Sequence, residues 1–361
     1  MKKLNVGVLG ATGAVGQNYV LLLENHSWFN VSYVAASPKS AGKKYSEAVS
    51  RKWFMDKDIP KNIADLVVGD ANKVEDAFGK CDFVFSAVEL EKELIKEVEN
   101  AYAKAGIPVV SNNSTHRWTE DVPMIIPEIN HEHLQIIPEQ KKHYGWEKGF
   151  IVVKPNCSIQ SFLTPLHALK IKGYNFRKII VTTEQASSGA GYPGVPSLDL
   201  IDNVIPYING EAEKTEKEPM KIFGKIENGK IKIAEDLKIS ATCTRVPVIN
   251  GHLASVSVEF DDKKPELEAI IEIWNEFKAL PQELDLPFAP KKPIIYRKEE
   301  NRPQPRKDRD NDKGMAVTVG RLRECAVLDV KFVGLSHNTI RGAAGGAILT
   351  AELLYTQGYF D

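Results

Sequence analysis

A glycine-rich turn near the start of the chain constrains the fold more than any other feature. Residues 4–9 are typical of a short buried strand and residues 17–25 of a helix, and between them stands Gly10-Ala11-Thr12-Gly13-Ala14-Val15-Gly16. Glycines in such a turn allow the backbone to approach a pyrophosphate, which rests on the helix N-terminus. The GxxGxxG spacing is a variant of the dinucleotide fingerprint. It predicts dinucleotide contacts at Gly10, Thr12, Gly13, Ala14, Val15 and Gly16; a tight turn that holds no ligand is the alternative.

The residues after the second strand indicate which dinucleotide binds. The strand at 31–35 is followed by Ser37-Pro38-Lys39-Ser40, and no acidic residue stands at its end. A site for NAD usually has Asp or Glu there to bind the ribose 2′-hydroxyl, whereas hydroxyls and a lysine suit a 2′-phosphate. We therefore expect NADP(H) as the cofactor, with Ser37, Lys39 and Ser40 near that phosphate. The alternative is a solvated loop.

Strands and helices alternate in the rest of the first half. Residues 82–88 and 108–111 are typical of buried strands, with a helix expected between them at 91–105. This alternation predicts an α/β fold with a parallel sheet, and a cofactor that lies along the carboxyl edge of that sheet. Ser86 and Asn112 would touch the cofactor there.

A cysteine stands where a strand meets a helix. The largely β-branched run 150–153 is stopped by Pro155, and residues 158–169 carry apolar residues at helical spacing. At a helix N-terminus the macrodipole favours a thiolate and lowers the pKa of a cysteine from about 8.5. Cys157 is therefore a candidate nucleophile for attack on a carbonyl. The alternative is a small buried apolar residue.

The second half supplies further strands and a candidate general base. A strand at 178–185 leads into the glycine-rich loop 186–194, which suits close approach to a cofactor or a neighbouring subunit. Strands at 238–247 and 252–260 flank Asn250-Gly251, a signal for an antiparallel hairpin. His252 is a candidate general base, although a lone histidine is usually structural.

Arg117 belongs to the first half of the chain, where it follows a turn at the expected sheet edge. It would bind an anionic group or lie on the surface.

Composition limits the class of protein. The 361 residues are 43% hydrophobic and 26% charged with a net charge of -1, which predicts a globular protein of about two domains and argues against a nucleic-acid partner. The four cysteines form no CxxC pair, so we expect neither disulfides nor a zinc site. We also expect a reducing, cytoplasmic location. His131-Glu132-His133 lacks further ligands, and no metal is expected. No membrane span is expected, and the charged run 297–313 is predicted to be an exposed excursion without chemistry of its own.

Several motifs together resemble one family. They are GATGAVG, SPKSAGK, PNCS, EQASSGAGYPGVPSLDLIDNVIP, SHNTIRGAAGG and the pair Arg245 and His252. The chain is similar over residues 7–359 to aspartate-β-semialdehyde dehydrogenase, in its archaeal and fungal branch. The resemblance implies a Rossmann-like NADP domain of residues 1–155 and 336–361. It also implies an α+β catalytic and dimerisation domain of residues 156–335, built on a mixed sheet.

The family's chemistry implies a role for each matching residue. L-aspartyl-4-phosphate would be reduced by NADPH to the semialdehyde and phosphate through a Cys157 thioester, in the biosynthesis of lysine or diaminopimelate, threonine, methionine and isoleucine. His252 would be the acid/base, and Gln185 and Asn156 would orient the intermediate and the nucleophile. An oxyanion donor is expected at the backbone N–H of Cys157 or Ser158. The remaining implied contacts are Arg245, Arg117, Lys221 and Glu218 for substrate, and Ser188, Gly189 and Asn338 for cofactor.

Two neighbouring families leave an alternative open. Malonyl-CoA reductase shares the scaffold and a similar SGAGYPG loop, and N-acetyl-glutamyl-phosphate reductase shares the chemistry. Pro155-Asn156-Cys157 and the complete substrate set favour the aspartyl enzyme. A binding protein without turnover would be expected to have lost Cys157 or His252, and both are present. A homodimer or homotetramer is expected from the resemblance alone.

Overall fold

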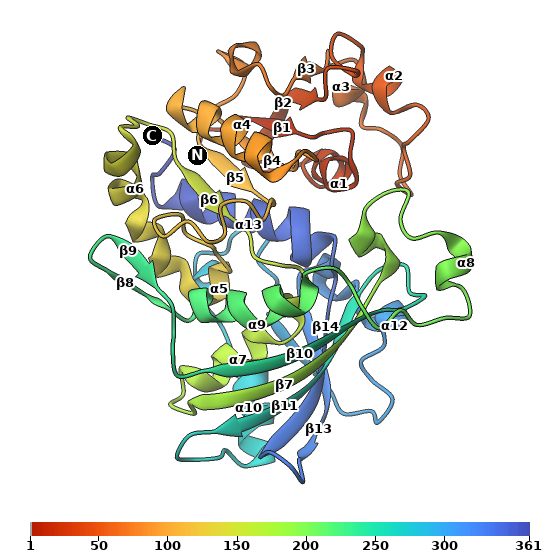
Figure 1. The fold of residues 1–361 in the computed structure, drawn as a ribbon, viewed down its shortest axis with the longest axis vertical. Helices are drawn as coiled ribbons and strands as arrows, with labels where there is room; N and C mark the ends of the chain where they lie inside the picture. The colour runs from red at the N-terminus through yellow and green to blue at the C-terminus, as the bar shows by residue number, and fades with distance from the viewer. Residues whose placement is uncertain (1) are drawn as a thin grey trace.

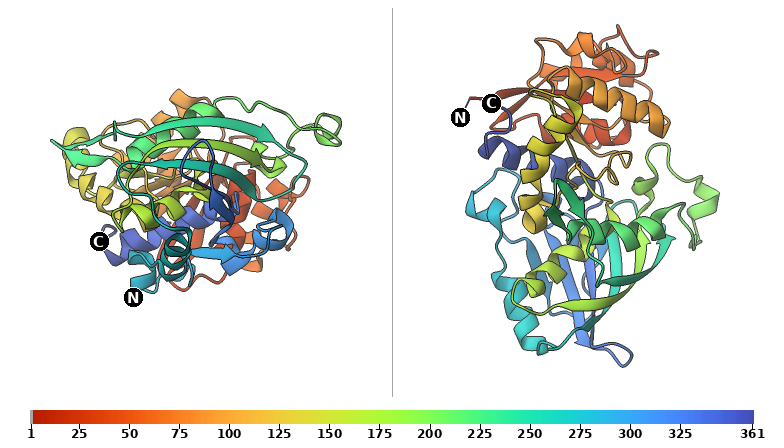
Figure 2. Two further views of the ribbon diagram at one scale, coloured as in Figure 1. Left: turned by 90° about the horizontal axis from the view of Figure 1, so that it is seen from below. Right: turned by 60° about the vertical axis from the view of Figure 1, so that its left-hand side comes forward.

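The computed structural model describes residues 2–361, which build two six-stranded sheets, one above the other in Figure 1. The first sheet is parallel and the second is mixed. The expected α/β fold with a Rossmann-like sheet and a second mixed sheet is therefore confirmed. The two ends of the chain lie close together beside the parallel sheet, as both views of Figure 2 show, and the Tyr355 hydroxyl donates a hydrogen bond to the carbonyl of Lys2.

The parallel sheet is formed by the first half of the chain. In their spatial order its strands are β3 (Gly69–Asp70), β2 (Phe29–Ala36), β1 (Leu4–Leu9), β4 (Phe83–Ser86), β5 (Val109–Ser111) and β6 (Ile151–Val153). The helices of this half are α1 (Ala14–Leu22), α2 (Tyr45–Val49), α3 (Lys61–Ala64), α4 (Lys92–Lys104), α5 (Pro127–Asn130) and α6 (Ile137–Tyr144), with 3₁₀ turns η1 (Val74–Ala77) and η2 (His131–Ile136).

Both faces of this sheet are covered, because alternate residues of its strands point to opposite sides. Val84 packs in one core cluster with Val98 of α4, whereas Phe85 packs in the other with Tyr19 of α1. Strands buried on both faces are continuous apolar runs rather than alternating ones, and this is why β4 reads Phe-Val-Phe-Ser.

The mixed sheet is formed by the second half. In their spatial order its strands are β10 (Lys238–Arg245), β7 (Phe176–Gln185), β11 (His252–Phe260), β14 (Val330–Ser336), β13 (Val317–Glu324) and β12 (Ile294–Arg297). The expected hairpin of β10 and β11 is wrong, because β7 lies between them. β10 pairs with β7 in parallel, and β11 pairs with β7 antiparallel. The connection at Asn250-Gly251 therefore carries the chain across the end of β7.

Helices cover one face of the mixed sheet, and the rest of this half consists of connections. Trp274 of α10 is almost fully buried and donates a hydrogen bond to the carbonyl of Pro165 in α7, which joins the two covering helices at 3.0 Å. The elements are η3 (Ser158–Ser161), α7 (Leu163–Lys170), η4 (Ser187–Ala190), α8 (Ser197–Leu200), α9 (Glu211–Ile222), the small hairpin β8 (Lys225–Glu227) and β9 (Lys230–Lys232), α10 (Leu267–Glu276), α11 (Leu280–Glu283), α12 (Pro305–Asp308) and η5 (Asn311–Gly314).

The end of the chain returns to the first half. A π-helical turn η6 (Ile340–Ala344) leads into α13 (Gly345–Thr356), which lies below the parallel sheet in Figure 1. Ile348 and Leu353 of α13 are fully buried in one cluster with Val6 and Val8 of β1. The last helix of the chain is thus part of the core of the first sheet.

Candidate active site

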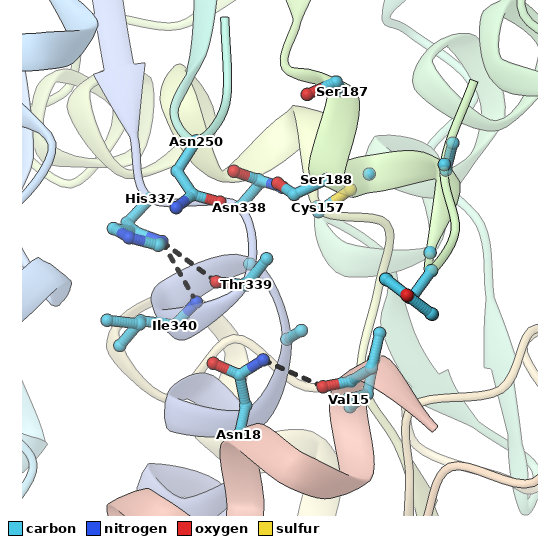
Figure 3. Close-up of a pocket in the computed structure, with 18 of the residues that line it drawn as sticks. Val15, Asn18, Cys157, Ser187, Ser188, Asn250, His337, Asn338, Thr339 and Ile340 are labelled. Atoms are coloured by element: carbon cyan, nitrogen blue, oxygen red, sulfur yellow. Dashed lines mark hydrogen bonds between the residues drawn. The ribbon is translucent and has the colours of Figure 1, made fainter. Parts of the chain in front are cut away.

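A cavity of about 1120 Å³ lies between the two halves and is large enough for a dinucleotide with a small substrate. Its walls come from the start of α1, the segment 54–57, the residues around Cys157, the loop 187–195, the first turn of α9 and the segment 337–343. Figure 3 shows Val15 and Asn18 of α1 facing Asn338 and Thr339, with Cys157 and Ser188 farther along the same space.

Cys157 and His252 form the reactive pair of this cavity. Cys157 directly precedes η3 and stands two residues after Pro155, in the connection that follows β6, and His252 is the first residue of β11. The Cys157 Sγ lies 3.3 Å from His252 Nε2, and the imidazole is fully buried. Two residues 95 positions apart are thus brought to one point by the two halves of the fold.

The expected lowering of the Cys157 pKa is wrong. Burial raises the pKa of this thiol to about 11, and the Glu211 carboxylate adds to the rise, while Lys154, Arg117 and Arg245 only partly oppose it. The expected helix is also divided, because a four-residue 3₁₀ turn precedes α7. The helix that would stabilise a thiolate therefore begins six residues after the cysteine, at Leu163.

Asn156 connects the reactive loop to α9 and β7. Its Nδ2 donates to both carboxylate oxygens of Glu211 at 3.0 Å, and Gln185 Nε2 donates to the same carboxylate at 3.2 Å. Asn156 Oδ1 accepts the backbone N–H of Ser158 at 2.7 Å. That amide is therefore occupied, so of the two expected oxyanion donors only the Cys157 N–H is left.

Glu218 and Lys221, which the resemblance assigned to substrate, do not line the cavity. Glu218 is fully buried. Its carboxylate accepts hydrogen bonds from the Arg117 guanidinium at 2.7 Å and from the backbone N–H of Asn156 at 2.6 Å. The Lys221 ammonium donates to the carbonyls of Arg117, Thr119 and Val122 at 2.7 to 2.8 Å. An ammonium has three N–H bonds, and these three carbonyls use all of them.

The cavity side of α9 presents Glu211 and Lys214 instead. Both line the cavity, and Lys214 Nζ lies 2.9 Å from Glu211 Oε1. Burial acts to raise the pKa of Glu211, but Lys214 and the amides of Asn156 and Gln185 outweigh it and lower the pKa. This pair was not predicted from the sequence, although Glu-x-x-Lys occurs at 211–214 as well as seven residues later in the same helix.

Arg245 and Gly189 pack against the reactive pair. Arg245 ends β10 beside Gln185 of β7, and its Nη1 donates to the carbonyl of Ala186 at 2.7 Å. A β-carbon at Gly189 would stand 2.8 Å from Arg245 Nη1 and 3.1 Å from His252 Cε1. Only glycine therefore fits at this point of the loop. Arg117, Asn112 and Asn156 line the cavity, whereas Arg245 and Gln185 are buried beside it.

The expected cofactor residues fall into two groups. Ala14, Val15, Ser188, Gly189 and Asn338 line the cavity, and Asn338 Nδ2 donates to the Ser188 hydroxyl at 2.8 Å. The second group lies outside the cavity wall. Gly10, Thr12 and Gly13 are in the turn before α1, Gly16 is in the first turn of α1, and Ser86 ends β4. In the turn after β2, Ser37 and Lys39 are exposed and Ser40 is buried.

The run 297–313 is not the exposed excursion that its charge predicts. Asp308 is almost fully buried, where it accepts hydrogen bonds from the Arg302 guanidinium and from the backbone N–H of Gln304. Arg309 and Asp310, which follow it, line the cavity. A buried carboxylate that neutralises neighbouring arginines holds this segment against the site.

The described residues form neither a candidate metal centre nor a candidate membrane helix. Within residues 2–361, no three His, Cys, Asp or Glu side chains are grouped so that they would hold a metal ion. Over the same range, no helix has the length and apolar character needed to cross a membrane.

The chain matches known proteins over almost its whole length. The NAD binding domain of semialdehyde dehydrogenase matches residues 5–137, and the semialdehyde dehydrogenase dimerisation domain matches residues 163–341. The aspartate-semialdehyde dehydrogenase of Archaeoglobus fulgidus is 47% identical over 98% of both chains. That of Aspergillus fumigatus is 44% identical over 99% of this chain and 98% of the relative.

A solved structure agrees with these relatives. The crystal structure of aspartate semialdehyde dehydrogenase with NADP from Candida albicans superposes with a TM-score of 0.90 at 38% identity, covering 99% of this chain and all of the other. Identity at this level over full-length chains, with the same two domains in the same order, leaves one assignment. The chain belongs to the aspartate-semialdehyde dehydrogenase family.

Proposed function

We propose that this protein reduces L-aspartyl-4-phosphate with NADPH to L-aspartate-4-semialdehyde and phosphate, and also catalyses the reverse reaction. The observation that carries the proposal is the Cys157 Sγ at 3.3 Å from His252 Nε2, at the wall of a cavity that also reaches α1. A thiol beside an imidazole is an arrangement for acyl transfer. The start of α1, after a glycine turn, is an arrangement for a dinucleotide. The protein would then act in the biosynthesis of lysine or diaminopimelate, threonine, methionine and isoleucine.

The chemistry divides one difficult step into two. The Cys157 sulfur adds to the acyl carbon of the substrate, phosphate leaves, and a thioester remains on the protein. Hydride then reaches the thioester carbon, and the C–S bond of the resulting thiohemiacetal breaks to release the aldehyde. The protein holds the acyl carbon at the sulfur throughout both steps.

Substrate recognition is assigned to two arginines, Arg117 in the cavity wall and Arg245 buried beside it. Arg245 would pair with the α-carboxylate and Arg117 with the phosphate, because a guanidinium binds both groups through two N–H bonds. In place of Glu218 and Lys221, we assign the substrate ammonium to Glu211 and a second phosphate contact to Lys214. This revision is supported by the exposure of Glu211 and Lys214 to the cavity and by the closed hydrogen bonding of Lys221.

The residues present fit NADP(H). A β-carbon at Gly10 would stand 2.2 Å from the carbonyl oxygen of Ala87, and α1 has neither a side-chain cap nor an acidic residue in its first turn. The first N–H groups of α1 are thus available to a pyrophosphate. Ser37, Lys39 and Ser40 would hold the 2′-phosphate, with Ser86, Ser188, Gly189 and Asn338 toward the nicotinamide. When bound, NADPH supplies the hydride.

We further propose that residues 1–155 with 336–361 act as the cofactor domain, that residues 156–335 act as the catalytic and dimerisation domain, and that the protein works as a homodimer or homotetramer. The segment with α8 projects from the body in Figure 2, and Leu198, Ile201 and Tyr207 on it are 89%, 65% and 66% exposed. Apolar side chains exposed to this degree on one segment suit a subunit contact. Four free cysteines support a reducing, cytoplasmic location.

The test follows NADPH absorbance. Purified protein is supplied with L-aspartate-4-semialdehyde, inorganic phosphate and NADP⁺, and in parallel with malonyl-CoA and NADPH. We expect NADPH to form in the first reaction only while phosphate is present, because phosphate must release the acyl group from Cys157. No reaction in the first mixture with oxidation of NADPH in the second would overturn the proposal and assign a thioester substrate instead.

A further inference from the structure

A cluster of polar side chains is buried behind the cavity wall, at the end of β5. At its centre is Glu99 of α4, which is fully buried and does not line the cavity. One oxygen of its carboxyl group, Oε1, accepts hydrogen bonds from the Ser111 hydroxyl at 2.6 Å and from Asn113 Nδ2 at 2.8 Å. Ser111 is the last residue of β5, and Asn113 lines the cavity. Glu99 therefore holds the turn through which the chain enters the cavity wall.

This turn, residues 111–113, is fixed by hydrogen bonds to two elements. The Ser111 hydroxyl donates to Glu99, and its oxygen accepts the backbone N–H of Asn113 at 3.0 Å. The Asn113 side chain donates a second hydrogen bond to the Ser86 hydroxyl of β4, at 3.1 Å. A side-chain amide has two N–H bonds. Because Asn113 uses one on α4 and the other on β4, the turn is tied to both.

The 111–113 turn also orients Arg117. The carbonyl of Asn112, the middle residue of the turn, accepts Arg117 Nη2 at 3.1 Å, and the carbonyl of Lys154 accepts Arg117 Nε at 3.0 Å. A guanidinium is planar and rigid, so two fixed acceptors set the direction of its remaining N–H bonds. Asn112 and Arg117 both line the cavity. A shift of the turn would therefore move the cation that we assign to the substrate phosphate.

The second oxygen of Glu99, Oε2, indicates a proton. Within residues 2–361, neither Oε2 nor His116 Nε2, which lies 3.9 Å from it, has a hydrogen-bond partner. Over the same range, His116 is the one basic side chain within 4.0 Å of this carboxyl group. An ionised carboxylate is costly to bury without a cation. A proton on Oε2 removes that charge and gives Oε2 an O–H bond to face Nε2.

The electrostatics of both side chains favour their neutral forms. Burial raises the pKa of Glu99, and the hydrogen bonds that its carboxyl group accepts oppose this rise only in part. Burial lowers the pKa of His116 to about 4; Lys96 and Lys221 lower it as well, while Asp121 opposes them. At neutral pH His116 is therefore an uncharged imidazole, which supplies no counter-ion for a Glu99 carboxylate.

We propose that Glu99 is a neutral carboxylic acid with its proton on Oε2, and that in this form it is the positioning residue that holds Arg117 at the phosphate through the 111–113 turn. The inference rests on the proposed function and adds to it a buried acid outside the cavity wall. A neutral side chain of the same shape should replace Glu99. In Glu99→Gln the amide carbonyl accepts in place of Oε1, and an amide N–H bond stands in place of the Oε2–H bond.

The protonation state can be measured on the wild-type protein without substrate. An infrared difference spectrum between the wild type and Glu99→Gln at neutral pH isolates the Glu99 carboxyl group from the other acidic side chains. We expect the carbonyl stretching band of a protonated carboxylic acid, shifted when D₂O replaces H₂O. The antisymmetric stretching band of a carboxylate in its place would overturn the proposal, whatever reaction the protein catalyses.

Kinetics of the phosphate-dependent reaction test the positioning role. Glu99→Met removes the acceptor of the turn, and we expect KM for inorganic phosphate to rise about tenfold or more, as for a weakened charged hydrogen bond. KM for L-aspartate-4-semialdehyde, which we assign to Arg245, should change little. Glu99→Gln should restore the wild-type KM for phosphate. A Gln variant as impaired as Met, or an equal rise of both KM values in Met, would refute the role.

A milder variant covers the case in which Glu99→Met does not fold. Ser111→Ala removes one hydroxyl from the turn and should also raise KM for phosphate more than KM for the semialdehyde, whereas no change in either value would contradict the proposal. NADP⁺ affinity and the thermal transition report folding in every variant. A wild-type protein that does not respond to phosphate would refute the proposed function and, with it, the role of Glu99 in holding Arg117 at the phosphate.

Discussion

Gly342 of η6 lies directly against the nucleophile: a β-carbon at position 342 would stand 2.8 Å from Cβ of Cys157. Because two carbons do not approach so closely, Gly342→Ala must displace either the cysteine or η6, and we expect the cysteine to move. A shift of about 1 Å at a reacting atom costs up to roughly a hundredfold, so we expect kcat to fall about ten- to a hundredfold. NADP⁺ affinity and thermal stability, measured on the same sample, should change little. Unchanged kcat would mean that η6 moves instead of the cysteine.

Removal of the nucleophile tests the covalent step. Cys157→Ala should lower turnover at least about a thousandfold, because no other thiol lines the cavity among the described residues. NADP⁺ titration by fluorescence should give the wild-type affinity, since α1 and the glycine turn are unaltered. Cys243→Ala, at a buried cysteine of β10, is the control and should retain activity. Turnover at the wild-type rate in Cys157→Ala would rule out a thioester on this residue.

Alkylation by iodoacetamide tests the pKa of the nucleophile. Only the thiolate reacts, and the raised pKa of about 11 means that the Cys157 thiolate is scarce at neutral pH and increases tenfold per pH unit. We expect the alkylation rate of Cys157, followed by peptide mass spectrometry, to rise without a plateau from pH 6.5 to 9.5. Cys325 is an internal reference: the backbone N–H of Leu328 at its sulfur lowers its pKa, so it should react first. A plateau for Cys157 near pH 7 would indicate a stabilised thiolate.

Substitutions of Glu211 and Glu218, both in α9, should have different effects. Glu211→Gln keeps the shape of the side chain but removes the charge offered to the substrate ammonium, and we expect KM to rise roughly ten- to a hundredfold, as for loss of a charged hydrogen bond of about 1.5 to 3 kcal/mol. Glu218→Gln removes the charge that accepts the buried Arg117 guanidinium at 2.7 Å. Its main effect should be a loss of about 3 to 5 kcal/mol in unfolding free energy. The reverse pattern would return the substrate role to Glu218.

A buried ion pair connects three separate elements. Arg341 of η6 donates to Glu128 of α5 and to the Thr164 hydroxyl of α7, at 2.8 and 2.9 Å. Arg341→Met would leave the Glu128 carboxylate buried without its cation, which costs about 3 to 5 kcal/mol. Urea unfolding measures the change. Asp65→Asn, at the exposed pair with Lys44, is the matched control and should leave the transition where it is. Equal midpoints for the two variants would refute the proposed importance of burial.

Local patterns in the sequence predict the parallel sheet well. The Gly10–Gly16 turn, the strand at 82–88 and the helix at 91–105 each carry their own signal, and the structure has β4 and α4 at those places. Pairing in the mixed sheet was not predictable in the same way. The patterns of β10 and β11 indicate strands but do not identify their neighbour, and β7, far earlier in the chain, separates them.

The site shows the same division between local and tertiary information. A cysteine after a strand and before a helix indicates a nucleophile, and its imidazole partner is predicted by resemblance. The sign of its pKa shift depends on burial by surrounding elements, which no local pattern contains. Glu211 and Glu218 stand seven residues apart on one helix face, so the spacing alone does not tell which of them reaches the cavity.

Helix α13, one of the last elements to be translated, packs against β1, the first. A ribosome makes β1 first and α13 last, roughly 20 to 70 s later at 5 to 20 residues per second. Until α13 emerges, the face of the parallel sheet that carries Val6 and Val8 has no Ile348 or Leu353 to cover it. The first half of the chain is thus completed by the last residues translated. A premature stop codon within α13 would therefore damage the amino-terminal half, which was finished long before.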